Sequence, residues 1–422
     1  MRNDIRVFFQ KHTLISIYTL VILILTTGIL ATTGFKHIPK ILVFAASLYF
    51  AYVAFHYLRL RVKLSSYFEK IKSFFGAKDT GILIYIVVGG LISYIIYHLV
   101  YLGGSPAIEA IGLSDNIEIA QLRRSITADN PKWMNYMSSF LLRAFIPFSI
   151  LYFFVKDKKL WYWIILFISC FYAFSLMQKS FIVSIMAPVL IYGIIKKKHR
   201  FTLVHISCIV VIIYSLVNIS NPDIAESHSD NIVLHEEQLP TASIISDSDH
   251  VQVEETNGIA DKIATFSRSL FNRVFITPGK TASIWFDLVP EKAPFLNGDG
   301  YRFIAKIKGS EYHNYFAELY PLMYPEYAKR GLKGSVNTAS FVADYANFGI
   351  VGLIFSGIIL GLFLIFVEAL FGNDFALKMG LNFYSIMIIS STLLTTTLLS
   401  GGWFLLLVMY LVLFNRPRDI RE

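Results

Sequence analysis

Arginine side chains occur in two loops that border apolar segments, and one occurs inside such a segment. Arg123 and Arg124 are adjacent in a polar loop, Arg273 follows a later apolar stripe, and Arg143 lies within SSFLLRAFIPF. A guanidinium group binds phosphate oxygens through forked, charge-assisted hydrogen bonds. A charge within a membrane span is costly, so Arg143 should face a cavity or a partner. These residues predict a site for a lipid diphosphate, although ordinary anionic headgroups or a structural pair would also explain each one.

Further side chains could complete such a site. Lys179 lies at the tip of a short polar break, MQKS, where snorkelling to the headgroups is the alternative explanation. Tyrosines between the Arg273 segment and the next apolar run could stack on sugars, or could form an interfacial aromatic belt. The binding candidates are Arg123, Arg124, Arg143, Lys179, Arg268, Arg302, Tyr312, Asn337 and Asn347.

Three ionisable groups in the same region could act as a general base: His313, Glu318 and Asp344. The chain has no HExxH, Walker, GxSxG or zinc-type spacing. Asp247–Asp249 forms a DxD like that of metal-dependent nucleotide-sugar transferases, but its flanks lack the strand pattern that would position it. We therefore expect neither a metal ion nor a cofactor.

The composition indicates a polytopic membrane protein. Of 422 residues, 55% are hydrophobic and 16% are charged, against about 25% charged in soluble domains. The net charge of +9 arises from Lys and Arg beside apolar segments, which is typical of residues that fix membrane topology and not of nucleic-acid binding. Cys170 and Cys208 lie in apolar runs, where we expect small buried side chains.

Hydropathy predicts about ten membrane-spanning helices with both termini in the cytoplasm. The connections assigned to the cytoplasm are basic, whereas Lys36 and Lys40 are exceptions on the opposite side. The break at Met177–Ser180 predicts a tight external turn, and SGG near the end predicts a hairpin. The expected spans are 14–32, 41–58, 82–102, 133–155, two within 161–195, 201–218, 348–370, 382–400 and 403–414.

These spans divide the chain into three parts. Residues 1–218 hold the first seven spans and the external loop 103–132, and residues 348–422 hold the last three spans and a basic tail. Residues 219–347 form a long external loop that cannot lie in a bilayer. Within it, 221–261 reads as an acidic spacer, and 262–347 as the segment that supplies an active site. An amphipathic surface helix from Ile259 is expected to end near Pro278-Gly279.

Two segments of this last part resemble a known family. FNRVFITPGKTASIWFDLVP and GSVNTASFVADYANFGIVGLIF are similar to stretches of the Wzy-type polymerases of bacterial O-antigen and capsule repeat units. The resemblance covers roughly 271–354. The matching residues are Arg273, Gly279, Asn337, Phe341, Asp344, Asn347, Gly349 and Gly352.

The resemblance implies an all-α, GT-C-like glycosyltransferase of the bacterial plasma membrane. Such an enzyme moves a growing glycan from undecaprenyl diphosphate to the non-reducing end of a new lipid-linked repeat unit. The resemblance makes Arg273 and either Arg123 or Arg124 the first candidates for stabilising the leaving diphosphate, and a chain-length regulator is a possible partner. On chemical grounds, Asp344 or His313 would take the proton of the acceptor hydroxyl. An O-antigen ligase and a lipid-linked oligosaccharide flippase are the alternatives. No internal repeat typical of transporters occurs in the sequence.

Overall fold

The described residues fold entirely into helices and their connections. The structure, a computed structural model, describes residues 8–414 except 77–80, 114–117, 120, 123–124, 127–129, 221–267, 269–270 and 330–333. Seven of its helices are long and apolar enough to cross a membrane. Three further apolar helices, α10 (Lys159–Ser175), α11 (Lys179–Ile195) and α21 (Phe375–Ile388), are shorter. This set of apolar helices is that of a polytopic membrane protein.

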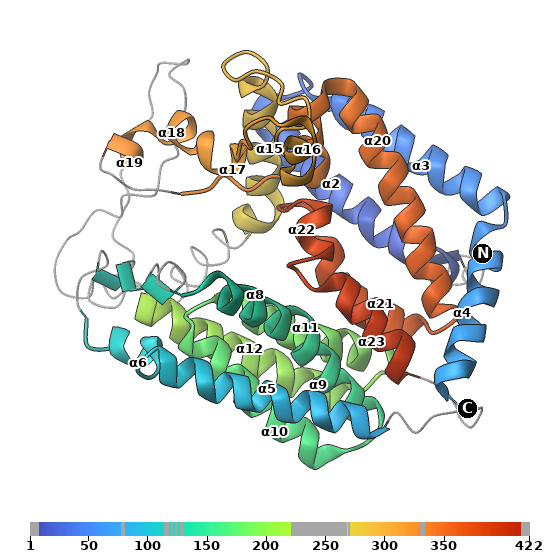
Figure 1. Ribbon diagram of the computed structural model, residues 1–422, viewed down its shortest axis with the longest axis vertical. Helices are drawn as coiled ribbons and strands as arrows, with labels where there is room; N and C mark the ends of the chain where they lie inside the picture. The colour runs from blue at the N-terminus through green and yellow to red at the C-terminus, as the bar shows by residue number, and fades with distance from the viewer. Residues whose placement is uncertain are drawn as a thin grey trace.

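The helices form two packed groups that the C-terminal segment joins (Figure 1). One group contains α2 (Thr13–Thr33), α3 (Ile38–Tyr57), α4 (Leu60–Gly76), α15 (Thr277–Leu288) and α20 (Ser340–Phe371). The other contains α5 (Gly81–Tyr101), α8 (Lys132–Phe140), η1 (Leu141–Phe145), α9 (Ile146–Val155), α10, α11 and α12 (His199–Ser220). Helix α21 packs on both α2 and α11, and α23 (Trp403–Leu413) packs on both α4 and η1.

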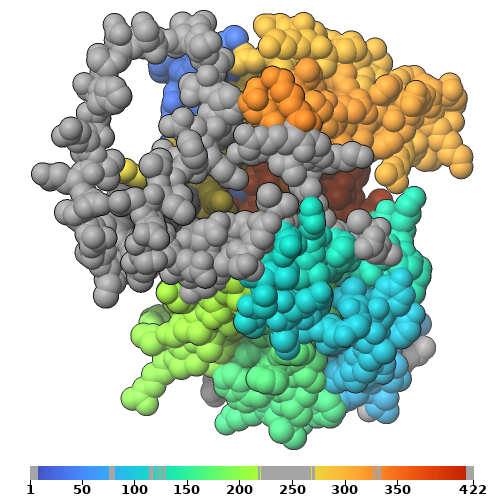
Figure 2. Space-filling model, turned by 90° about the vertical axis from the view of Figure 1, so that its left-hand side faces the viewer, coloured from blue at the N-terminus to red at the C-terminus, as the bar shows by residue number. Residues whose placement is uncertain are grey.

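The short helices gather at one end of the molecule, which we call the loop end. They are α6 (Pro106–Ala110), α16 (Arg302–Lys308), α17 (Tyr315–Glu318), α18 (Tyr320–Met323) and α19 (Pro325–Lys329) (Figure 1). Figure 2 shows this end. The yellow and orange segments lie above, the cyan and green segments lie below, and the red C-terminal segment is visible deep between them.

Close helix crossings in the first group depend on glycine. A Cβ on Gly357 of α20 would lie 2.8 Å from the backbone of both Phe44 and Leu48 of α3, and one on Gly361 would lie 3.0 Å from the Leu48 carbonyl. This Gly-xxx-Gly spacing lets two helix backbones approach closely. Close packing of this kind is typical of helices in lipid, where no hydrophobic driving force brings helices together. Gly28 of α2 and Gly279 of α15 form a second crossing, with less room still.

Two helices contain a π turn, and proline explains both. The turn η1 precedes Pro147 and holds Arg143, while η2 (Asn272–Ile276) precedes Pro278 and holds Arg273. A proline ring clashes with the carbonyl four residues earlier, and the wider turn absorbs that clash. The expected helix end at Pro278-Gly279 is therefore wrong, because the chain runs from η2 directly into α15.

Two other expectations are corrected. The C-terminal hairpin turns at 389–393, and not at SGG. Gly401 and Gly402 instead interrupt the returning span between α22 (Leu394–Leu398) and α23, where Gly402 has φ +75°. Cys208 is exposed and Cys170 is only partly buried, because both lie on helix faces that the other helices do not fully cover.

A buried carboxylate, that of Glu368, joins helices at the opposite end of the first group. Glu368 is 0% exposed and accepts hydrogen bonds from the Leu14 N–H at 3.0 Å and the Tyr52 hydroxyl at 2.8 Å. The Arg61 guanidinium lies 3.5 Å away. Residue Glu368 of α20 thus caps the first turn of α2, since a carboxylate satisfies the free N–H groups of a helix start.

The α3–α20 crossing gives a direct test. Replacing Gly357 with Ala should destabilise the protein by about 1–3 kcal/mol, because the added methyl group meets backbone that cannot move aside. Thermal unfolding in detergent measures the effect. Gly89→Ala is the control, since nothing lies within 4 Å of its added Cβ. Equal midpoints for the two variants would show that the close crossing does not limit stability.

Candidate functional site

A small pocket opens at the loop end, between segments that are far apart in the sequence. Its wall comes from α15, from the loop before α16, from the loop before α17, from the first turns of α20 and from the 389–393 turn. The pocket is shallow, and the space it encloses is about 10 Å³, roughly that of one water molecule. The lining residues are Trp285, Leu296, Gly300, His313, Asn314, Tyr315, Phe316, Ala343, Ala346, Asn347 and Leu393.

A break in α20 fixes the first loop of this pocket. Gly349 adopts φ +62° and ψ −144°, so the helical hydrogen bonding is interrupted there. The carbonyls of Ala346 and Asn347 accept instead from the N–H groups of Leu296 at 3.0 Å and Asn297 at 2.8 Å. The Asn347 side chain adds a bond from the Gly300 N–H at 3.0 Å. The Asn-Phe-Gly motif therefore anchors the loop 296–300 to the helix.

Asp344, one turn earlier on α20, is engaged in the same support. The Tyr301 hydroxyl donates to its carboxylate, and the Tyr301 ring stacks on Phe348 at 6.4 Å between centroids. Asp344 is half-buried and is not among the pocket-lining residues. Its position favours a role in holding the loop over that of a base acting in the pocket.

His313 reaches the pocket with a carboxylate beside it. Its Nδ1 lies 3.3 Å from Oε2 of Glu318, and the other Glu318 oxygen accepts from the Asn314 N–H at 2.6 Å. Both side chains are a little over two-fifths exposed. A carboxylate at Nδ1 favours the tautomer whose Nε2 is free to accept a proton. Sequence analysis named both residues as separate candidates but gave no reason to pair them.

A polar cluster behind His313 fixes the backbone of this segment. Asp299 accepts from Lys308 Nζ at 2.6 Å and from Ser310 Oγ at 2.5 Å, and its carbonyl accepts from the His313 N–H at 3.0 Å. The hydrogen bond from Lys308 and then that from Ser310 lower the pKa of the Asp299 carboxyl below its usual value of 3.8.

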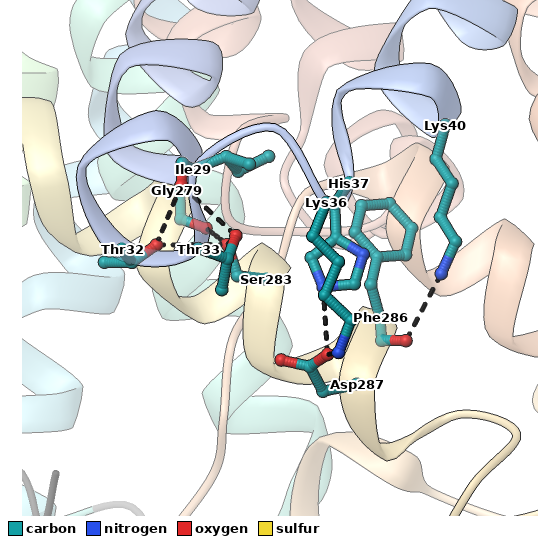
Figure 3. A network of polar contacts seen from close by, with 10 residues as sticks. All are labelled: Ile29, Thr32, Thr33, Lys36, His37, Lys40, Gly279, Ser283, Phe286 and Asp287. Carbon is teal, nitrogen blue, oxygen red and sulfur yellow. Dashed lines mark hydrogen bonds and ion pairs between the residues drawn. The ribbon is translucent and has the colours of Figure 1, made fainter. Parts of the chain in front are cut away.

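The wall formed by α15 is held by the turn between α2 and α3 (Figure 3). Oδ1 of Asp287 lies 2.5 Å from Lys36 Nζ and 3.0 Å from His37 Nε2. Lys40 donates to the Phe286 carbonyl at 3.3 Å and lies over the Phe286 ring, 4.7 Å from its centroid. The Asp287 carboxylate thus pairs with the charge of Lys36, and Phe286 covers that of Lys40.

Trp285 of α15 is the residue that sequence analysis missed. Its side chain is 1% exposed and lines the pocket, with its ring edge-on to Tyr315 and tilted against Phe316. Its indole Nε1 has no hydrogen-bond acceptor among the described residues. Nothing in the sequence around it distinguishes an unsatisfied tryptophan from one in a packed core.

The predicted arginines are not brought to one place by the described contacts. Arg143 lies in η1, which packs on α5, α8, α9, α11 and α23, whereas Arg273 lies in η2, which packs on α2 and α15. The Nε of Arg143 is buried without a hydrogen-bond partner, and its guanidinium lies 5.6 Å from the Phe181 ring centre. Arg273 and Arg268 are exposed. Arg123, Arg124, the acidic spacer and Asp247–Asp249 lie outside the described residues.

The remaining candidates are at the rim or away from the pocket. Arg302 is exposed, with its guanidinium 5.0 Å from the ring centre of half-buried Tyr312. Asn337 is exposed just before α20, and Lys179 is partly buried at the start of α11. Within the residues that the structure describes, no three His, Cys, Asp or Glu side chains are grouped so as to hold a metal ion.

No protein-family model, no curated protein and no solved structure matches the chain.

The Asp299 cluster should make the segment before α17 sensitive to acid. A carboxyl whose pKa is lowered in the folded state stabilises it above the unfolded pKa, and that contribution is lost as pH falls through the folded value. We expect hydrogen exchange at the His313 amide to accelerate as pH is lowered through and below 3.8, beyond the change in intrinsic exchange. Asp299→Asn should remove this pH dependence. The same acid response in that variant would rule out Asp299 as its source.

Proposed function

We propose that this protein polymerises lipid-linked oligosaccharide repeat units. It transfers a growing glycan from undecaprenyl diphosphate to the non-reducing end of a new undecaprenyl-linked unit, as the resemblance to Wzy-type polymerases implies. One observation supports this assignment above the others. The Asn347-Phe348-Gly349 segment of that resemblance organises a pocket that also contains His313 with Glu318 beside it.

The chemistry needs a base and a stabilised leaving group. An acceptor hydroxyl oxygen attacks the anomeric carbon of the donor sugar, and its proton passes to Nε2 of His313. A new glycosidic bond forms as the bond from that carbon to the diphosphate oxygen breaks, and the electron pair leaves with the lipid diphosphate. Cations at the membrane surface stabilise the developing negative charge more than they stabilise the ground state.

The cation proposed for the diphosphate is Arg273, which lies in the π turn just before α15 and is exposed. Arg143 lies in the other helix group with its Nε buried, and we do not assign it to the same diphosphate. We include Arg123 or Arg124 on the sequence argument alone. The reaction takes place in the plasma membrane with the loop end facing outward, and a chain-length regulator is the proposed protein partner.

The purified protein, supplied with lipid-linked repeat units, should produce a ladder of longer glycans. Persistence of single units only would overturn the polymerase proposal. Transfer of one unit to a lipid A acceptor without a ladder would instead identify a ligase. Movement of the units across liposomes without new bonds would identify a flippase. In cells, loss of a polymerase leaves single capped units, whereas loss of a ligase leaves none.

Arg273→Ala should abolish long chains while the protein still inserts. Loss of one preorganised donor to a developing anion reduces turnover by about 10²–10³-fold. Gel analysis of the ladder measures the effect. Arg200→Ala is the control, since that arginine is also exposed but lies in the first turn of α12. Normal chain length in the Arg273 variant would remove Arg273 from the mechanism.

His313→Ala should reduce turnover by about 10²–10⁴-fold, the usual contribution of a general base, and added imidazole should restore part of it. Glu318→Gln should give a smaller loss, since the base remains but its orientation is less fixed. His199→Ala provides an exposed histidine as control. An unaffected rate in the His313 variant would assign the base elsewhere.

A further inference from the structure

Helix α16 turns its apolar residues away from the rest of the protein. Phe303 and Ile307 are 75% and 69% exposed, whereas Ala305 between them is buried at 1%. Residues four apart lie on one face of a helix, so Phe303 and Ile307 form an apolar stripe on the side opposite Ala305. A helix at the surface of a soluble domain has the reverse orientation, with its apolar residues toward the core. The orientation of α16 therefore indicates an apolar surrounding outside the protein.

Basic side chains border this stripe. Arg302 and Lys306 are also four residues apart, and they follow the same helix along one side of the stripe. Both are exposed, and neither is joined by an ion pair to a carboxylate among the described residues. An apolar stripe beside Lys and Arg is the pattern of a helix that lies in the plane of a membrane surface, with its cations among the phosphate groups.

The fold fixes α16 at both ends. At its start, the Tyr301 hydroxyl donates to the carboxylate of Asp344 in α20. At its end, Lys308 Nζ donates to the Asp299 carboxylate at 2.6 Å and to the Asn297 carbonyl at 3.1 Å. The exposure of the apolar stripe is thus a consequence of how the chain holds this helix, and not of a loose attachment.

The attachment places α16 at the loop end of α20, a helix that is long and apolar enough to span a membrane (Figure 1). A Cβ on Gly298 would lie 2.7 Å from Ile304 of α16 and 3.3 Å from Phe348 of α20. The long apolar run of α20 begins at Phe348. Further along it, Val351 and Phe355 are 55% and 59% exposed, as lipid-facing side chains are. Helix α16 therefore lies level with the boundary between acyl chains and headgroups.

We propose that α16 is an interfacial anchor that binds the membrane leaflet at the loop end. Phe303 and Ile307 enter the boundary between headgroups and acyl chains, and Arg302 and Lys306 contact the phosphate groups of anionic phospholipids. The anchor goes beyond the proposed function and does not depend on it. It sets the depth of the segment that the Asp299 cluster holds, and hence the height of His313 above the acyl chains.

Spin labels measure this depth. Phe303→Cys and Ile307→Cys are made separately in the full chain without its two native cysteines, labelled with a nitroxide and reconstituted in vesicles of phosphatidylethanolamine and phosphatidylglycerol. The ratio of oxygen to nickel-chelate accessibility, measured by power-saturation EPR, rises with depth. We expect both labels to give a ratio above that of Glu326→Cys on α19, where the side chain is 68% exposed, and below that of Val351→Cys.

Lys306→Cys is the matched control within the helix, and its label should be shallower than the two labels on the apolar stripe. Equal ratios at positions 303, 307 and 326 would overturn the anchor, because the stripe would then face water. Loss of access to both reagents, with dipolar broadening between labels, would also overturn it and identify a second copy of the chain as the partner.

The lipid composition tests the role of the cations. In vesicles of phosphatidylcholine alone, the labels at positions 303 and 307 should become shallower, because Arg302 and Lys306 then lose their net-anionic partners. Unchanged depth in both vesicles would refute the contribution of anionic phospholipids.

Discussion

The loop end depends on two backbone carbonyl groups of α20, those of Ala346 and Asn347, which lie at the break in helical hydrogen bonding at Gly349. Gly349 turns the chain of α20 out of helical geometry, and a freed carbonyl in an apolar setting must find another donor. The N–H groups of Leu296 and Asn297 supply it, and Asn347 adds a third bond to the same loop. The loop 296–300 is thereby fastened to α20 by backbone hydrogen bonds from Leu296 and Asn297.

A second set of contacts sets the opposite wall. Gly28 and Gly279 let α2 and α15 approach until their backbones touch, and the turn after α2 holds Asp287 through Lys36 and His37. The α2–α3 hairpin therefore determines where Trp285 stands, although it contributes nothing to the pocket surface. His313 at the edge of the pocket, and Glu318 beside it, are both partly exposed.

Features that depend on a local sequence pattern could be predicted from the sequence. Apolar length identified most of the long apolar helices. The segment 262–347 was expected to supply an active site, and most residues that line the small pocket lie in it, although Leu393 does not. Prediction from the sequence failed where contacts between distant parts of the chain determine the local structure. Pro278 appeared to end a helix but is accommodated by a π turn packed on α2, and the hairpin turn avoids SGG because Ile389 bonds to Ser340. The pairing of His313 with Glu318 depends on how the chain turns between them. The burial of the Trp285 N–H without an acceptor depends on five segments that surround it.

The carboxylate of Glu368 has a consequence for how the protein is made. It completes the first turn of α2, yet the ribosome adds it 354 residues after Leu14. During synthesis the earliest helix therefore waits with its leading amide groups uncapped, and Arg61 waits without its counter-charge. Contacts so distant along the chain form late and slow assembly. The first turn of α2 can therefore reach its final hydrogen bonding only after residue 368 has been synthesised.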